Sequence, residues 1–67
     1  MRVHLRPQQR IVDVAGRRRV GQLLAELGVL PGTAMVIRGD MLLTDAEVVE
    51  DADEIEVRAV ISGGAHP

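Results

Sequence analysis

The chain of 67 residues contains no cysteine and no Phe, Tyr or Trp. The absence of cysteine excludes disulfides, thiolate metal ligands and catalysis by a side-chain thiol. Without those aromatic residues, a core has to be built from Val, Leu, Ile, Met and Ala. A chain of this length buries a modest fraction of its surface, so we expect one small domain with an efficiently packed core.

Lysine is absent as well, because all 8 basic residues are arginines. The chain therefore has no side-chain amine that could accept an isopeptide bond. The formal net charge is −2, the only dense basic run is 17–19, and the stretch from Asp40 to Glu56 contains acids and no bases. Proteins that bind nucleic acids usually have a basic face or aromatic stacking residues, so we expect no direct binding to nucleic acids.

Apolar runs are short, and none approaches the roughly 18 residues of a membrane-spanning helix. The first residues lack the hydrophobic segment of a signal peptide. These absences predict a cytoplasmic protein that does not contact a membrane. The chain has two histidines, His4 and His66. Metal sites usually take more ligands than these could supply, so we expect no metal site.

Four segments have the extended character of strands, and most of them alternate apolar and polar residues. They span residues 2–6, 11–14, 34–38 and 54–61, and a shorter segment spans 41–43. In segment 34–38 we expect Met35 and Ile37 to point inward and Val36 to point outward. In the last segment we expect Arg58 and Val60 to point outward.

A short helix is predicted between the second and third strands. Its signal is a set of apolar residues spaced as one helix face, namely Val20, Leu23, Leu24 and Leu27. Gly28 follows directly and predicts a left-handed C-cap. Arg19 is not a favoured N-cap, and Gly21 costs about 1 kcal/mol relative to Ala inside a helix. We therefore expect packing, rather than propensity, to hold this helix.

The predicted order is strand, strand, helix, strand, short strand, strand. In this order the first and last strands can pair in parallel at the centre of one sheet, whose apolar face the helix covers. The sequence therefore predicts an α+β fold of the β-grasp type, with a mixed four- to five-stranded sheet and one helix. We assign residues 1–61 to this domain and residues 62–67 to a flexible C-terminal tail.

The tail begins with Ser62-Gly63-Gly64, directly after the last strand. Paired glycines allow a backbone to enter a channel that is too narrow for side chains. The tail is therefore a candidate for the working part of the molecule. An ordinary frayed terminus is the alternative, since most domains have one.

These features resemble the ThiS/MoaD family of ubiquitin-like sulfur carriers, over residues 1–64. The resemblance rests on the chain length, on segment 51–57 and on the ending Ile61-Ser62-Gly63-Gly64. Segments 2–6, 24–28 and 36–40 look most similar to the bacterial carrier that supplies sulfur for 2-thiolation of tRNA, with the thiamine-thiazole carrier close behind. Ala52 stands where the family usually has glycine, which would strain the turn if it needs a positive φ.

The resemblance implies a carrier that is not itself an enzyme and binds no cofactor. The Gly64 carboxylate would be adenylated, with ATP used by an activating enzyme of the ubiquitin-activating type. A sulfurtransferase or cysteine desulfurase would then supply sulfur to form a thiocarboxylate. A downstream tRNA thiolase, or a thiazole synthase in thiamine biosynthesis, would receive that sulfur.

The chain continues past Gly64 with Ala65-His66-Pro67, which departs from the family's ending. Either a processing protease removes these residues or this copy is inactive. We favour removal, because chain ends of this kind are readily cut.

An open sheet face can dock onto a larger protein, so we take Val36, Val60 and Arg58 as a candidate docking patch. Two other functions remain open on the sequence alone. One is a ubiquitin-like modifier conjugated to other proteins through Gly64. The other is a β-grasp binding module of the TGS kind, in which the sheet face acts and the tail is idle.

Overall fold

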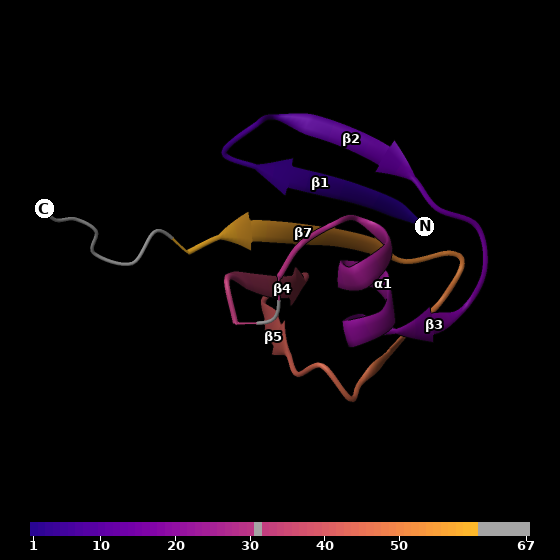
Figure 1. The fold of residues 1–67 in the computed structure, drawn as a ribbon. Coiled ribbons are helices and arrows are strands. Elements are labelled where there is room, and N and C mark those ends of the chain that lie inside the picture. Colours follow the sequence, from indigo (N-terminus) through magenta and orange to yellow (C-terminus); the bar gives the residue numbers. More distant parts are fainter. Residues whose placement is uncertain (31, 61–67) are drawn as a thin grey trace, which may run out of the picture.

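A computed structural model describes residues 1–30 and 32–60 of the chain. Its elements are β1 (Arg2–Arg6), β2 (Arg10–Asp13), β3 (Arg18–Arg19), α1 (Val20–Glu26), β4 (Ala34–Arg38), β5 (Met41–Leu43), β6 (Val48–Val49) and β7 (Glu54–Ala59) (Figure 1). The predicted α+β fold is confirmed. Among the residues described, no helix has the length and apolar character needed to cross a membrane.

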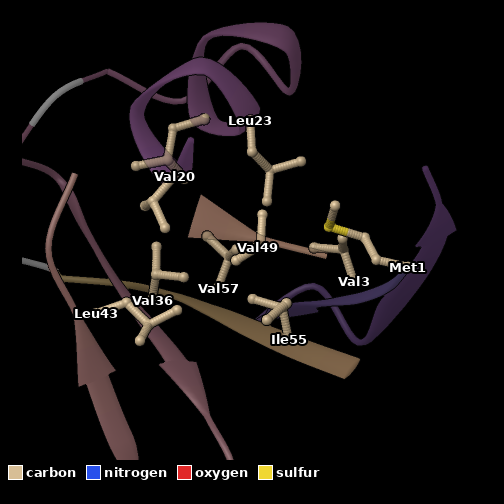
Figure 2. Close-up of a cluster of buried hydrophobic side chains, with 10 residues drawn as sticks. Met1, Val3, Val20, Leu23, Val36, Leu43, Val49, Ile55 and Val57 are labelled. Carbon is tan, nitrogen blue, oxygen red and sulfur yellow. The ribbon is translucent and has the colours of Figure 1, made fainter. Parts of the chain in front are cut away.

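The main sheet has five strands in the order β2-β1-β7-β4-β5. β1 pairs with β7 in parallel, whereas β1–β2, β4–β5 and β4–β7 are antiparallel. The predicted parallel pairing of the first and last strands is therefore confirmed, and β7 occupies the centre. Helix α1 packs over one face of this sheet, and the other face is open (Figures 1 and 2). This is the layered arrangement of a β-grasp fold.

The core lies between α1 and the covered sheet face. Figure 2 shows side chains from α1 directed toward side chains from the strands. The buried apolar residues are Met1, Val3, Val20, Leu23, Leu24, Val36, Leu43, Val49, Ile55 and Val57. All of them are aliphatic, as the absence of aromatic residues required. Burying each such side chain contributes roughly 1.5–3 kcal/mol, so the loss of one would be serious in so small a core.

The orientation predicted for β4 is wrong by one residue. Val36 is 2% exposed and belongs to the core, whereas Met35 is 38% exposed. In the register, Val36 lies opposite Val57 on one side and Leu43 on the other. Directly opposed residues share a face, so these two partners hold Val36 inward. Alternation alone allows both phases of a strand, and the larger pair Met35 and Ile37 pointed to the wrong one.

Helix α1 begins without a side-chain cap at Arg19. Backbone carbonyls of the loop between β5 and β6 replace the cap. The N–H groups of Val20 and Gly21 donate to the carbonyls of Glu47 and Asp45 at 2.8 and 3.0 Å. Two of the donors that every helix start leaves unpaired are thereby satisfied. The weak predicted start is thus compensated by tertiary contacts.

The helix ends as predicted at Gly28, which has a φ of +75°. The Gly28 N–H donates to the Ala25 carbonyl at 3.1 Å, and the Val29 N–H donates to the Leu24 carbonyl at 2.9 Å. This pair of bonds is the Schellman arrangement, which satisfies the last carbonyls of a helix.

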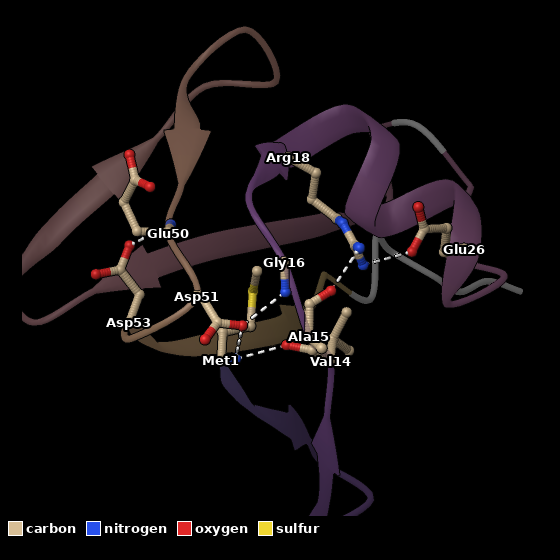
Figure 3. A network of polar contacts seen from close by, with 9 residues as sticks. All are labelled: Met1, Val14, Ala15, Gly16, Arg18, Glu26, Glu50, Asp51 and Asp53. Atoms are coloured by element: carbon tan, nitrogen blue, oxygen red, sulfur yellow. Dashed lines mark hydrogen bonds and ion pairs between the residues drawn. The ribbon is translucent and has the colours of Figure 1, made fainter.

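A second, two-stranded sheet pairs β3 with β6. This sheet was not predicted, because strands of two residues are too short to show a periodic pattern. The three arginines of the run 17–19, which contains β3, all contact other segments of the fold. Arg18 donates to Glu26 at 2.7 Å (Figure 3). Arg17 lies 3.4 Å from Glu50, and Arg19 donates to the Ala46 carbonyl at 2.8 Å. These contacts fasten the loop before α1 to the rest of the fold.

The turn before β7 is organised by Asp53. Its Oδ2 accepts the Glu50 N–H at 2.8 Å and Nη1 of Arg38 at 3.0 Å (Figure 3 shows the first bond). The Glu50 N–H and then the Arg38 guanidinium lower the pKa of Asp53, because both favour its charged form. Gln9 is the one non-glycine residue with a positive φ in the described part of the chain. Ala52 is therefore free of the strain that its place in this turn suggested.

Candidate functional site at the root of the tail

Strand β7 leads directly into the tail. We call its last described residues, Arg58, Ala59 and Val60, the tail root. The Val60 N–H donates to the Thr33 carbonyl at 2.9 Å, one residue beyond the end of the strand. The Thr33 hydroxyl in turn donates to the Leu30 carbonyl at 2.6 Å. Because β7 also lies between β1 and β4, the tail root is fixed to the body of the fold.

The predicted tail residues Ser62, Gly63 and Gly64 lie outside the described residues. The structure shows at which end of the sheet the chain leaves β7. The first residues of β7 lie beside the first residues of β1, and the last residues of β7 lie beside Arg6, where β1 ends. The tail root is therefore at the end of the sheet away from Met1 (Figure 1).

The open sheet face carries the side chains that alternate with the core residues. By register these are Arg2, His4, Arg6, Ile11, Asp13, Met35, Ile37, Leu42, Glu54, Glu56 and Arg58. Its aliphatic members on adjacent strands are Met35, Ile37 and Leu42, which we call the β4–β5 patch. Met35 is 38% exposed and Leu42 is 62% exposed. This is an apolar surface that no other part of the described chain covers.

The predicted docking patch is corrected accordingly. Val36 points into the core and cannot contact a partner. Arg58 is on the open face, directly opposite Met35 in the register, and Val60 is 45% exposed beyond it. The apolar residues of β4 on the open face are those that the sequence analysis expected to point inward. With the other orientation of this strand, the sequence would have predicted the β4–β5 patch.

Charged side chains run beside this patch. Nη2 and Nε of Arg58 donate to one Glu56 oxygen at 2.7 and 3.0 Å, and Nε of Arg6 lies 3.8 Å from the same oxygen. Nε2 of His4 contacts Glu54 at 2.5 Å. Such exposed pairs contribute about 0–1 kcal/mol each to folding. An aliphatic patch beside polar groups is the usual composition of a protein-binding surface.

Two hollows flank the tail root. One, of about 360 Å³, opens on the helix side and includes Leu5, Val29, Leu30 and Ala34 in its lining. The other, of about 300 Å³, lies against the turn after β1. Arg6 and Ala59 line both. The sequence did not indicate these hollows, because their walls come from four separate parts of the chain.

Metal binding has no candidate among the described residues. In residues 1–30 and 32–60, no three His, Asp or Glu side chains gather in a way that could hold an ion. The carboxylates of this region instead accept bonds from arginines and backbone N–H groups.

No family model matches the chain. The chain is 45% identical over 65 residues to the sulfur carrier protein TtuB of Thermus thermophilus, and the match covers 96% of this chain and 100% of that protein. The chain belongs to the ThiS/MoaD family of ubiquitin-like sulfur carriers. The resemblance found in the sequence is thereby confirmed.

Family membership bears on how the surface around the tail root is used. A sulfur carrier acts by contacting other proteins. We therefore expect some of its surface residues to stabilise the fold and others to be free for those contacts. Thr33 and Leu30 anchor and border the tail root, and sequence reasoning missed both. The sequence predicted a turn at 31–32, ahead of β4, and therefore a loop at this place. It did not indicate that this loop would bond to the residues after β7.

Proposed function

We propose that this protein carries sulfur as a thiocarboxylate at Gly64 for the thiolation of tRNA. The observation that carries the proposal is that Gly63 and Gly64 follow, a few residues along the chain, a central strand that ends at Ala59 and is anchored beyond its end through Val60. The likeness to a named sulfur carrier over 96% of the chain supports it. The destination in tRNA is supported by the segments quoted above, including β1 and the turn after β4.

The chemistry explains why the tail needs a partner. A carboxylate is a poor electrophile, because its charge is delocalised and repels nucleophiles. When a carboxylate oxygen of Gly64 attacks the α-phosphorus of ATP, pyrophosphate leaves and an acyl adenylate forms. The terminal sulfur of a partner's persulfide then attacks the carbonyl carbon and displaces AMP. A second thiol cleaves the sulfur–sulfur bond, which releases the thiocarboxylate and leaves a disulfide on the partner.

The carrier contributes reach and access rather than catalysis. Residues 62–64 extend about 10 Å when stretched, at roughly 3.3 Å per residue. Glycine at the last two positions lets the backbone approach ATP and the attacking sulfur closely. The acid, base and ATP-binding groups belong to the adenylating enzyme, so this protein is not an enzyme and holds no cofactor of its own.

We assign docking on the adenylating enzyme to the β4–β5 patch, with Arg58 and Val60 at its border. Exposed aliphatic side chains on adjacent strands form a surface that a partner can desolvate, while the charged side chains beside them form a rim. The remaining partners are a sulfurtransferase or cysteine desulfurase and a tRNA thiolase. We place these steps in the cytoplasm.

Residues Ala65, His66 and Pro67 have to be removed before Gly64 can react. We assign this removal to a processing protease, because a short chain end is readily cut.

Adenylation can be tested by ATP–pyrophosphate exchange with the adenylating enzyme of the same organism. Three forms are compared: the full chain, a form that ends at Gly64 and a form that ends at Gly63. We expect exchange with the form ending at Gly64 alone. Equal exchange with all three forms, or none with any of them, would contradict the proposal. Thiolated tRNA, rather than thiazole or protein adducts, is the expected product when the thiolase is added.

A further inference from the structure

Charge is unevenly distributed along the axis of β7. The end at which β7 begins carries the acids Asp13, Glu50, Asp51, Asp53 and Glu54, and a hollow of about 520 Å³ there is lined by four of them and by Arg2. Three of these acids lie against cations: Glu50 against Arg17, Asp51 against the amino group of Met1, and Asp53 against Arg38. The end at which β7 gives way to the tail carries Arg6, Arg10 and Arg58. The tail therefore leaves from a basic pole of a molecule whose net charge is −2.

The basic pole keeps uncompensated charge. Arg6 and Arg58 both lie against Glu56, so one carboxylate is shared between two guanidinium groups. Arg10 is exposed and forms no ion pair with any other residue in the described ranges. In the register Arg10 lies opposite Leu5, so the two side chains share a face. Leu5 lines the helix-side hollow, which places Arg10 beside that hollow.

The helix-side hollow is lined mainly by aliphatic side chains, and Arg6, Gln8 and Thr33 are the polar residues of its lining. Leu30 is 70% exposed at its border, which is the highest exposure among the large hydrophobic residues described. A hollow of this kind suits an aliphatic side chain from another protein. RNA is a poorer fit, because the chain has no Phe, Tyr or Trp on which bases could stack.

We propose that Arg6, Arg10, Leu30 and the helix-side hollow form a second docking surface, which binds an acidic loop bearing an aliphatic side chain at the entrance of the adenylating enzyme's active site. The inference rests on the proposed function, since that enzyme has to take in the tail. The aliphatic side chain of the loop enters the hollow, and its carboxylates face the arginines. Together with the β4–β5 patch, this surface lets the enzyme hold the fold from both faces where the tail emerges.

The charge separation also orients the approach. An acidic entrance attracts the basic pole and repels the opposite end, so the carrier arrives with its tail leading. Steering of this kind raises association rates and weakens with ionic strength.

The decisive experiment measures binding of the full chain to the adenylating enzyme of the same organism by calorimetry, at low and at high salt. Arg10→Glu is compared with Arg17→Glu, which makes the same change in net charge on an exposed residue before β3. At low salt we expect Arg10→Glu to weaken binding about tenfold and Arg17→Glu to change it less than about twofold. The difference should shrink at high salt. Equal effects of the two variants would overturn the inference.

A second pair of variants tests the hollow. Leu30→Ser should weaken binding about fivefold at both salt concentrations, because it removes apolar contact area. Met41→Ser is the control, since Met41 is 59% exposed but lies at the far end of β4's hairpin. Equal losses in the two variants would count against the hollow. Circular dichroism should show that all four variants are folded.

Two further outcomes separate this inference from the proposed function. If the wild-type form ending at Gly64 supports exchange while Arg10→Glu and Leu30→Ser bind like wild type, the inference alone fails. If that form supports no exchange, the proposed function fails first. Binding to purified tRNA is measured in parallel, and a loss confined to tRNA in Arg10→Glu would overturn the assignment to a protein partner.

Discussion

The two ends of β7 differ in what their polar groups do. At its start, Asp53 accepts the Glu50 N–H, Asp51 accepts the Gly16 N–H at 2.6 Å, and the Met1 nitrogen donates to the Val14 carbonyl at 2.5 Å (Figure 3). Asp53 also accepts a bond from Arg38. At its end, Arg10 forms no ion pair with another described residue, and Arg6 and Arg58 share the single carboxylate of Glu56. One end holds the fold together, and the other is left available for contacts.

This difference suggests a division of labour along a single strand. Residues near the start of β7 should affect stability when changed, and residues near its end should affect recognition. Residues on its core side should affect stability throughout. Single substitutions at the two ends of β7 can separate these effects.

Ile55→Ala should be the most destabilising of these changes. Ile55 is 0% exposed, and replacing such a side chain by Ala costs about 2–5 kcal/mol. Val60→Ala, at the other end of the same strand segment, should cost less than about 0.5 kcal/mol, because Val60 is 45% exposed. Urea unfolding measures both. A Val60→Ala variant as unstable as Ile55→Ala would show that the tail root is part of the core.

Val36→Ser and Met35→Ser test the corrected phase of β4. Val36→Ser should cost about 2–3 kcal/mol, because it removes apolar burial and places a hydroxyl in the core. Met35→Ser should change the free energy of unfolding by less than about 0.5 kcal/mol and instead weaken binding to the adenylating enzyme. Thermal unfolding and calorimetry separate the two effects. The reverse pattern would restore the orientation that the sequence suggested.

Asp53→Asn should have a smaller effect that depends on pH. The Asn oxygen can still accept the Glu50 N–H, so the variant removes mainly the charge, at a cost of about 1 kcal/mol near neutral pH. The pKa of Asp53 is lowered in the folded protein, so its contribution is complete above the unfolded pKa of about 4 and is lost as pH falls through the folded value.

The difference in unfolding free energy between wild type and Asp53→Asn should therefore be constant near neutral pH and shrink in acid. Urea titrations across this range measure it. A difference that stays unchanged in strong acid would contradict a role for the charge of Asp53 in stabilising the turn.

An element of the fold was predictable from the sequence where its local pattern allowed only one structure. The spacing of the α1 residues and Gly28 determined a helix with its covered face and its end, and the alternation in β1 and β7 determined their core sides. Segment 34–38 was ambiguous, because either phase of A-M-V-I-R buries apolar residues. Its phase is set by Val57 and Leu43, which are distant in sequence. Tertiary pairing decides such cases.

The site was predictable only in part for the same reason. The Gly-Gly ending is a local pattern and could be found directly. The basic pole is assembled from Arg6, Arg10 and Arg58, which come from three strands, and it exists because β1 and β7 run in parallel. The hollow beside it needs the loop after α1 as well. Neither feature has a sequence pattern of its own.

The central claim is that Gly64 becomes a thiocarboxylate, and the intact mass of the protein tests it most directly. The carrier is produced together with its adenylating enzyme and sulfur donor, and its mass is measured without derivatisation. The account predicts a species that ends at Gly64 and is heavier by about 16 Da, the exchange of one oxygen for sulfur. A chain that always keeps Ala65, His66 and Pro67, or one ending at Gly64 that never gains this mass, would contradict it.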